Sequence, residues 1–198
     1  MGSFMKANLK LDSIYDLDPV SLKKMGMKGI LFDIDNTLEE YATKEPGERS
    51  IAFIRRLGEY GFRIGILSNA SHKRAERFLN GFPKMDYPEI LMVSKAGKPL
   101  KSGFLKLVHE MGIKPQEAVM VGDQLYTDIW GGNRAGCYTV LVNPINKSIE
   151  PAFVRFKRFI EKPFMEKAFF ANKNVKFKLA TLGNDAGICG AAKLVLED

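Results

Sequence analysis

Short apolar runs alternate with longer segments of helical periodicity along residues 1–150. The runs are nearly continuous and rich in branched residues, which is typical of strands buried on both faces. They lie at 29–34, 62–68, 89–94, 118–123 and 137–142. Between them, apolar residues recur three and four positions apart and predict helices over 47–60, 71–81, 99–112 and 126–136. The alternation predicts an α/β domain whose central parallel sheet is covered by helices on both faces.

The pattern stops after Pro144, and the remaining chain has a different composition. We expect a domain over 1–150, a basic aromatic segment over 151–178 and a tail over 179–198. Segment 151–178 carries eight Lys/Arg against two Glu, interleaved with seven phenylalanines. Its apolar face fits either a membrane interface with anionic head groups or packing on the domain. Packing is slightly favoured because Pro163 would break a long helix.

Composition narrows the setting of the protein. Cys137 and Cys189 lie far apart in no spacing typical of a metal site or a disulfide, so we expect two reduced, buried cysteines. The N-terminus lacks the apolar core of a signal peptide, and no stretch approaches the ~18 apolar residues that span a bilayer. A cytoplasmic protein is therefore expected. The net charge of +7 suits an anionic partner, whether phosphate ester, nucleic acid or acidic lipid surface, without choosing among them.

Polar residues follow four of the predicted strands at their carboxyl ends. They are Asp33, Asp35, Ser68, Asn69, Lys98 and Asp123. In open α/β sheets the ligand crevice lies outside the carboxyl ends of the strands, so segments remote in sequence meet there. The sequence therefore predicts one polar site at this edge of the sheet.

The residue types at this edge indicate phosphoryl chemistry. Adjacent carboxylates repel each other unless a cation compensates, and Mg²⁺ bound by one or two carboxylates and a substrate phosphate is the usual partner. Ser68 and the amides after it can donate to phosphate oxygens, and Lys98 adds positive charge. Asp33 would attack phosphorus and form an aspartyl-phosphate, while Asp35 would protonate the leaving oxygen and then activate water. Asp123 would supply a further oxygen to the metal ion.

Four motifs in order resemble the haloacid dehalogenase (HAD) superfamily of aspartate-nucleophile phosphatases. They are "DIDNT" with Asp33 and Asp35, "LSNA" with Ser68 and Asn69, "KAGKP" with Lys98, and "GDQLYTD" with Asp123 and Asp128. The resemblance implies a three-layer, Rossmann-like fold and a Mg²⁺ ion held by the Asp33 side chain, the Asp35 backbone carbonyl and Asp123. Residues 4 to about 170 are similar to the YqeG-type subgroup, subfamily IIIA, whose eukaryotic relatives are phosphatidylglycerophosphate phosphatases.

Several alternatives stay open at this point. Lys95 competes with Lys98 for the third-motif role, and Asp128 is as well suited to capping a helix as to orienting the metal ion or the lysine. A phosphotransferase would pass the phosphoryl group to an acceptor other than water. A phosphate-binding scaffold would keep the fold without turnover, although four intact motifs argue against it.

Chain length limits what can cover the site. Only 34 residues separate Asp35 from Asn69, and a helix with a short loop uses them, so no cap domain is expected. An open site favours a substrate phosphate carried by a macromolecule or a lipid. For a lipid substrate, we expect the protein to make peripheral contact with the inner face of an anionic membrane. No recognised nucleic-acid-binding module is present, and nucleic acid is not an expected partner.

The final stretch, "LATLGNDAGICGAAKLVLED", resembles the C-terminal end of ROK-family sugar kinases. About 20 residues match, and the phosphate loops and zinc motif of those kinases have no counterpart in the chain. No kinase activity is inferred, and the role of this tail is left open.

Overall fold

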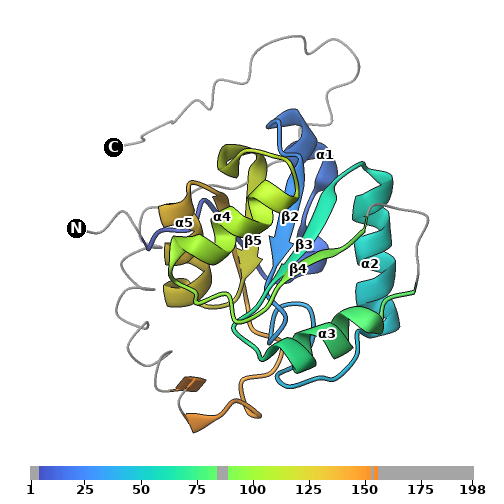
Figure 1. Cartoon of the computed structure of the whole chain (residues 1–198), viewed down its shortest axis with the longest axis vertical. Helices are drawn as coiled ribbons and strands as arrows, with labels where there is room; N and C mark the ends of the chain where they lie inside the picture. The colour runs from blue at the N-terminus through green and yellow to red at the C-terminus, as the bar shows by residue number, and fades with distance from the viewer. Residues whose placement is uncertain (1–4, 84–88, 153, 156–198) are drawn as a thin grey trace, which may run out of the picture.

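A computed structural model describes residues 5–83, 89–152 and 154–155. One parallel sheet of six strands lies at the centre of the protein, in the order β1-β6-β5-β2-β3-β4 (Figure 1). The strands are β1 (Leu9–Leu11), β2 (Gly29–Phe32), β3 (Arg63–Leu67), β4 (Leu91–Val93), β5 (Ala118–Gly122) and β6 (Tyr138–Val142). The helices are α1 (Pro19–Lys24), α2 (Glu48–Glu59), α3 (His72–Asn80), α4 (Lys101–Glu110) and α5 (Trp130–Ala135). The shorter turns are η1 (Ile14–Asp16), η2 (Pro115–Glu117) and η3 (Leu125–Ile129), a single π-helical turn.

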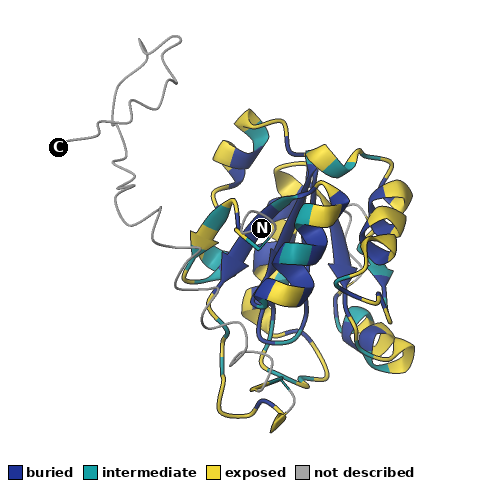
Figure 2. Ribbon diagram, turned by 90° about the vertical axis from the view of Figure 1, so that its left-hand side faces the viewer, coloured by how far each residue is buried: buried dark blue, intermediate teal, exposed yellow. Residues whose placement is uncertain are grey.

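The predicted α/β architecture is confirmed, because each of the five apolar runs contains a strand and helices cover both faces of the sheet. Side chains of β2 alternate between two buried clusters. Ile30 and Phe32 face α1, α2 and α3, whereas Leu31 faces α4 and α5. Strands β2 and β5 at the centre of the sheet are accordingly buried throughout, while the edge strands are partly exposed and the helices expose their outer sides (Figure 2). Full burial of each such side chain contributes roughly 1.5–3 kcal/mol to folding.

Strand β1, turn η1 and helix α1, all near the N-terminus, were not predicted. Strand β1 pairs with β6 at one edge of the sheet. Its three residues are too few for an alternating apolar pattern to be recognised in the sequence. Helix α1 begins after Asp18, whose side chain accepts a hydrogen bond from the backbone N–H of Val20 at 3.0 Å, and Pro19 occupies the first helical position. The helix predicted over 126–136 is also divided, because its first turn is η3.

The strand order creates the crevice for the site. From β2 the chain moves outward through β3 and β4 and then returns to β5, on the other side of β2. The order therefore reverses beside β2, which is the topological switch point where α/β sheets bind ligands. Phe32 pairs with Val121, so Asp33 and Asp123 leave neighbouring strands at the same edge. In the described ranges β2 and β3 are joined by one loop and α2, and no cap domain covers this edge.

Part of the predicted organisation lies outside the described residues. This holds for the tail 179–198, for Cys189 and for most of segment 151–178. The predicted burial of Cys137 is confirmed, and burial raises the pKa of its thiol to about 12. In the ranges that the structure describes, no helix combines the length and the apolar character needed to cross a bilayer.

Candidate active site

A buried lysine joins two aspartates at the carboxyl edge of the sheet. The Nζ of Lys98 donates to Oδ1 of Asp33 and to Oδ1 of Asp128, both at 2.7 Å. The three side chains are only 2%, 7% and 0% exposed, respectively. Lys95, the alternative in the same loop, is exposed. The structure therefore places Lys98, and not Lys95, in the site.

The loop that carries Lys98 is fixed by Asn69. The backbone N–H of Lys98 donates to Oδ1 of Asn69 at 2.8 Å, and Nδ2 of Asn69 donates to the Lys98 carbonyl at 3.1 Å. Asn69 was predicted to bind substrate. In the structure its side-chain amide hydrogen-bonds the backbone of Lys98 and so positions the loop that carries the lysine. Ser68 is buried beside it, and its hydroxyl accepts a hydrogen bond from the N–H of Ala70 at 3.1 Å. Substrate contacts of Ser68 and Asn69 stay predictions.

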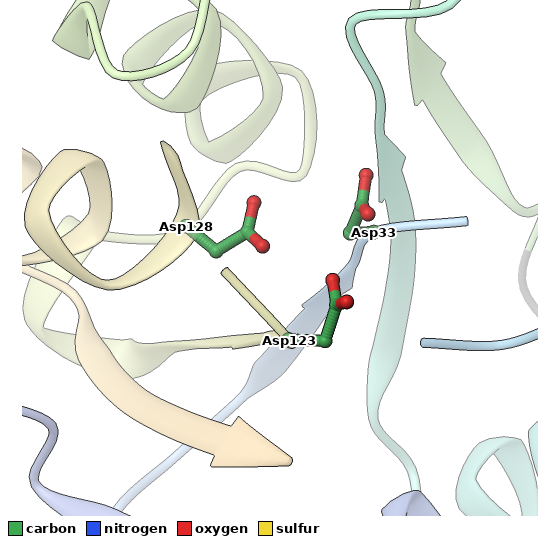
Figure 3. A group of neighbouring side chains, drawn as sticks. All are labelled: Asp33, Asp123 and Asp128. Atoms are coloured by element: carbon green, nitrogen blue, oxygen red, sulfur yellow. The ribbon is translucent and has the colours of Figure 1, made fainter. Parts of the chain in front are cut away.

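Three buried carboxylates converge around the lysine. Oxygen atoms of Asp33, Asp123 and Asp128 lie within 4.8 Å of one another, and Figure 3 shows the three carboxyl groups pointing into a common space. Thr37 donates its hydroxyl to Oδ1 of Asp123 at 3.3 Å. A side chain at Gly122 would collide with Asp128, so only glycine allows this approach. Such a set of hard oxygen donors suits a divalent cation such as Mg²⁺.

The electrostatics of the site fit a bound cation as well. Burial raises the pKa of Asp33 to about 7, and although Lys98 lowers this pKa, Asp128 and Asp35 raise it further. Burial alone would lower the pKa of Lys98, but the charges of Asp128 and Asp33 raise it above its usual value, so the ammonium stays charged. The cluster thus holds three carboxylates, of which Asp33 and Asp128 pair with one ammonium group, and a divalent cation would balance the remaining negative charge.

The carboxylate of Asp128 makes contacts of both kinds that the sequence left open, one with the lysine and one with the start of a helical turn. Its Oδ1 orients Lys98, while its Oδ2 accepts a hydrogen bond from the N–H of Gln124 at 3.1 Å, at the start of η3. Asp128 therefore orients Lys98 and also stabilises η3, the turn in which Asp128 itself lies. The predicted metal set was Asp33, the Asp35 carbonyl and Asp123; the structure adds the Asp128 carboxylate to the cluster, and the role of the Asp35 carbonyl stays a prediction.

The side chain of Asp35 is held apart from the acidic cluster. Arg74 of α3 forms a two-pronged ion pair with it, from Nη1 to Oδ2 at 2.7 Å and from Nη2 to Oδ1 at 2.6 Å. The N–H of Ala42 donates to the same Oδ1 at 2.8 Å. Sequence reasoning missed Arg74, because a basic residue in an amphipathic helix gives no sign of its partner.

The chain after β6 is fastened to the loop that carries both aspartates. Nδ2 of Asn36 donates to Oε1 of Glu150 at 2.6 Å, Oδ1 of Asn36 accepts from the N–H of Asn146 at 3.1 Å, and the Asn36 carbonyl accepts from the N–H of Ile145 at 3.2 Å. Asn36 adopts a left-handed backbone conformation with φ of 59°, and Glu150 is only 5% exposed. No sequence signal links residues so far apart, so this contact was not predicted.

Comparison with known proteins identifies the family. A model of haloacid dehalogenase-like hydrolases matches residues 39–136. The probable phosphatase YqeG of Bacillus subtilis is 35% identical over 152 residues, which cover 76% of this chain and 83% of that protein. The chain belongs to the haloacid dehalogenase-like hydrolases. It is a phosphatase of the YqeG type within that family.

Other similar proteins differ in their substrates. A chloroplastic/mitochondrial phosphatidylglycerophosphate phosphatase of Arabidopsis thaliana is 31% identical over 80% of this chain, and a glyceraldehyde 3-phosphate phosphatase of Pyrococcus furiosus is 35% identical over 53%. The alignments span less than half of either protein, 46% and 44% of their lengths. An uncharacterized protein from Listeria monocytogenes shares the fold, with a TM-score of 0.52 and 22% identity over 63% of this chain and 85% of that one.

The contact between Asn36 and Glu150 yields a first prediction for this phosphatase. Glu150→Ala leaves a buried amide donor without its acceptor, which costs about 1–3 kcal/mol. A protein of this size loses about 2–4 °C of Tm for each kcal/mol. Glu150→Gln keeps an acceptor oxygen, and we expect it to retain most of the Tm and of the aryl phosphate turnover. Thermal unfolding and turnover of both variants test this, and equal losses in the two variants would contradict the assigned contact.

The raised pKa of Asp33 yields a second prediction, for the metal-free phosphatase. A carboxyl whose pKa is higher in the folded than in the unfolded state destabilises the fold as pH rises from about 4 through about 7. Asp33→Asn removes this titration and also one carboxylate partner of Lys98, so in EDTA the Tm of the variant relative to wild type should be several degrees more favourable at pH 8 than at pH 5. Thermal unfolding of both proteins at the two pH values measures the difference. A Tm difference that is the same at both pH values, or more favourable to the variant at pH 5, would be the opposite result.

Proposed function

We propose that this chain is a Mg²⁺-dependent phosphomonoester hydrolase that forms an aspartyl-phosphate on Asp33. One observation carries the proposal: Asp33 lies at the topological switch point with Lys98, Asp123 and Asp128 gathered around it. A carboxylate beside a fixed ammonium group can meet a phosphate dianion there at a reduced electrostatic cost. Membership in a family of phosphatases supports the same reaction.

The chain's own residues account for each proton and bond. A carboxylate oxygen of Asp33 bonds to phosphorus as the bond from phosphorus to the leaving oxygen breaks, and the carboxyl of Asp35 gives its proton to that oxygen. Asp35 then takes a proton from water as the water oxygen bonds to phosphorus. The bond between phosphorus and Asp33 breaks, and inorganic phosphate leaves. Ser68 and Lys98 donate to phosphoryl oxygens during both steps.

The residues that would hold the ion are Asp33, Asp123 and Asp128, together with the backbone carbonyl of Asp35. When bound, Mg²⁺ supplies the positive charge that offsets repulsion between the substrate phosphate and these carboxylates. Lys98 pairs with both Asp33 and Asp128 and so holds these two carboxylates close together.

A phosphate presented at a lipid surface is the substrate class that we favour, with phosphatidylglycerophosphate as its representative. Three features support it: the open carboxyl edge of the sheet, the basic and phenylalanine-rich composition of segment 151–178, and the similarity to phosphatidylglycerophosphate phosphatases. Peripheral contact with an anionic membrane would add to affinity through the basic residues. Similarity to archaeal glyceraldehyde 3-phosphate phosphatases supports a second candidate, a small soluble phosphate.

A panel of substrates at matched Mg²⁺ separates the two candidates. It contains phosphatidylglycerophosphate in anionic vesicles, glyceraldehyde 3-phosphate, a sugar phosphate and an aryl phosphate, with Asp33→Asn as the blank. We expect the lipid to have by far the highest kcat/KM, and Asp33→Asn to release no phosphate from any substrate. Added salt should weaken vesicle binding, because charges are screened beyond ~8 to 10 Å.

Two results would contradict the proposal at different levels. A kcat/KM that is orders of magnitude higher for glyceraldehyde 3-phosphate, without binding to anionic vesicles, would exclude the lipid substrate and keep the reaction. Phosphate release by Asp33→Asn equal to that by the wild type would exclude the reaction itself.

A further inference from the structure

The ion pair between Arg74 and Asp35 is the feature that the proposed reaction leaves unexplained. Both oxygens of the Asp35 carboxylate accept a guanidinium N–H, and Oδ1 accepts a backbone N–H as well. A pair with this planar, two-pronged geometry is among the strongest polar contacts in proteins. The exposed fractions of the Asp35 and Arg74 side chains are 16% and 28%, so the pair is partly open to solvent.

This ion pair competes with the role proposed for Asp35. To exchange a proton with the leaving oxygen, Asp35 must direct one oxygen toward the substrate, within hydrogen-bonding distance. While the guanidinium stays in place, both oxygens are engaged in strong contacts with Arg74. This ion pair therefore fits the substrate-free state of the protein. Turnover requires that at least one of the two hydrogen bonds from Arg74 to Asp35 is broken.

Arg74 has donor capacity beyond this contact. Its Nε is buried and has no hydrogen-bond partner in the part of the chain that the structure describes. A buried donor without a partner is costly, so a ligand oxygen that gains access to it when the guanidinium moves away from Asp35 would be bound favourably. The guanidinium also lies close enough to Asp33 for the charge of that carboxylate to help raise the pKa of Arg74, after the larger effect of Asp35. Arg74 and Asp33 therefore influence each other electrostatically, in addition to the direct contact of Arg74 with Asp35.

The chemistry of the guanidinium defines the ligand. Its planar fork matches the two oxygens of a phosphate or a carboxylate, and it stays charged at every working pH. The scissile phosphate has its own partners in Lys98 and the loop after Ser68, so Arg74 is available to an anion elsewhere on the substrate. Its neighbours along α3, Lys73 and Arg77, are exposed and add positive charge to the same helix.

We infer that Arg74 is a specificity-determining residue that binds a second anionic group of the substrate, on the leaving-group side, and thereby releases Asp35 to contact the leaving oxygen. The inference rests on the proposed function and narrows it. The substrate class is a phosphomonoester whose leaving group carries its own phosphodiester or carboxylate. Phosphatidylglycerophosphate belongs to this class because a phosphodiester joins its lipid and glycerol parts, whereas glycerol 3-phosphate has no second anion.

The test compares soluble substrates, so that membrane binding plays no part. One is the deacylated headgroup of phosphatidylglycerophosphate, which carries a phosphodiester and a phosphomonoester. The other is glycerol 3-phosphate, and an aryl phosphate reports the basic reaction. The measured quantity is the ratio of kcat/KM for the headgroup to kcat/KM for glycerol 3-phosphate, determined for wild type, Arg74→Gln and Arg74→Lys.

We expect a wild-type ratio of about ten or more, because a hydrogen-bonded charge contact is worth at least that factor. Arg74→Gln should lower the ratio by about tenfold, mainly through a higher KM for the headgroup. Arg74→Lys keeps the charge without the fork and should give an intermediate ratio, and it serves as the test if Arg74→Gln does not fold. The matched control is Arg77→Gln on the same helix, whose side chain is 57% exposed and pairs with Glu45 at 3.2 Å. Its ratio should stay within about twofold of wild type, because exposed ion pairs contribute little.

Three results would overturn the inference. A wild-type ratio near one would show that no second anion is recognised. An equal loss on both substrates in the Arg74 variants would mean that Arg74 only positions Asp35. A similar fall in ratio for Arg77→Gln would assign the effect to the general charge of α3. In each case, Asp33-dependent turnover of the aryl phosphate by the wild type would leave the proposed function intact, while no turnover of any substrate would contradict both.

Discussion

The ammonium group of Lys98 and the two carboxylates that it joins are the contact on which the site depends. A carboxylate as buried as Asp33 or Asp128 would be costly without a cationic partner. Lys98 supplies that partner to both at once. Because the two aspartates and the lysine follow three different strands, this contact requires the parallel sheet and its switch point to be in place. The arrangement of the reacting groups is therefore inseparable from the fold.

Supporting hydrogen bonds give this cluster its precision. Asn69 fixes the backbone on both sides of Lys98, and Asn36 ties the loop of Asp33 and Asp35 to the chain around Glu150. Such contacts hold reacting groups in place, which is how a site on loops reaches the positional accuracy that catalysis needs. The same cluster carries a cost, since the raised pKa of Asp33 shows that its ionised form is disfavoured by burial.

The central sheet and the position of the site could be predicted from the sequence, because long apolar runs and the motifs that follow them carry strong local signals. Strand β1 could not, since three residues show no period. The contacts of Arg74 with Asp35 and of Glu150 with Asn36 were also beyond prediction, because they depend on how loops bring distant residues together. Asp128 was ambiguous for a related reason: its π-helical turn, permitted by Gly122, decides where the carboxylate points.

The central claim is that three buried carboxylates, two of which pair with the ammonium group of Lys98, form a site for a divalent cation. The most direct measurement is the Tm of wild type, Asp123→Asn and the surface control Glu110→Gln, each in EDTA and in excess Mg²⁺. A ligand at 100 times its Kd stabilises a protein by about 2.7 kcal/mol. The account predicts that Mg²⁺ raises the Tm of wild type and of Glu110→Gln by several degrees, and that Asp123→Asn loses most of this shift. A wild-type Tm that Mg²⁺ does not change, or an equal shift in all three proteins, would contradict the proposed cation site.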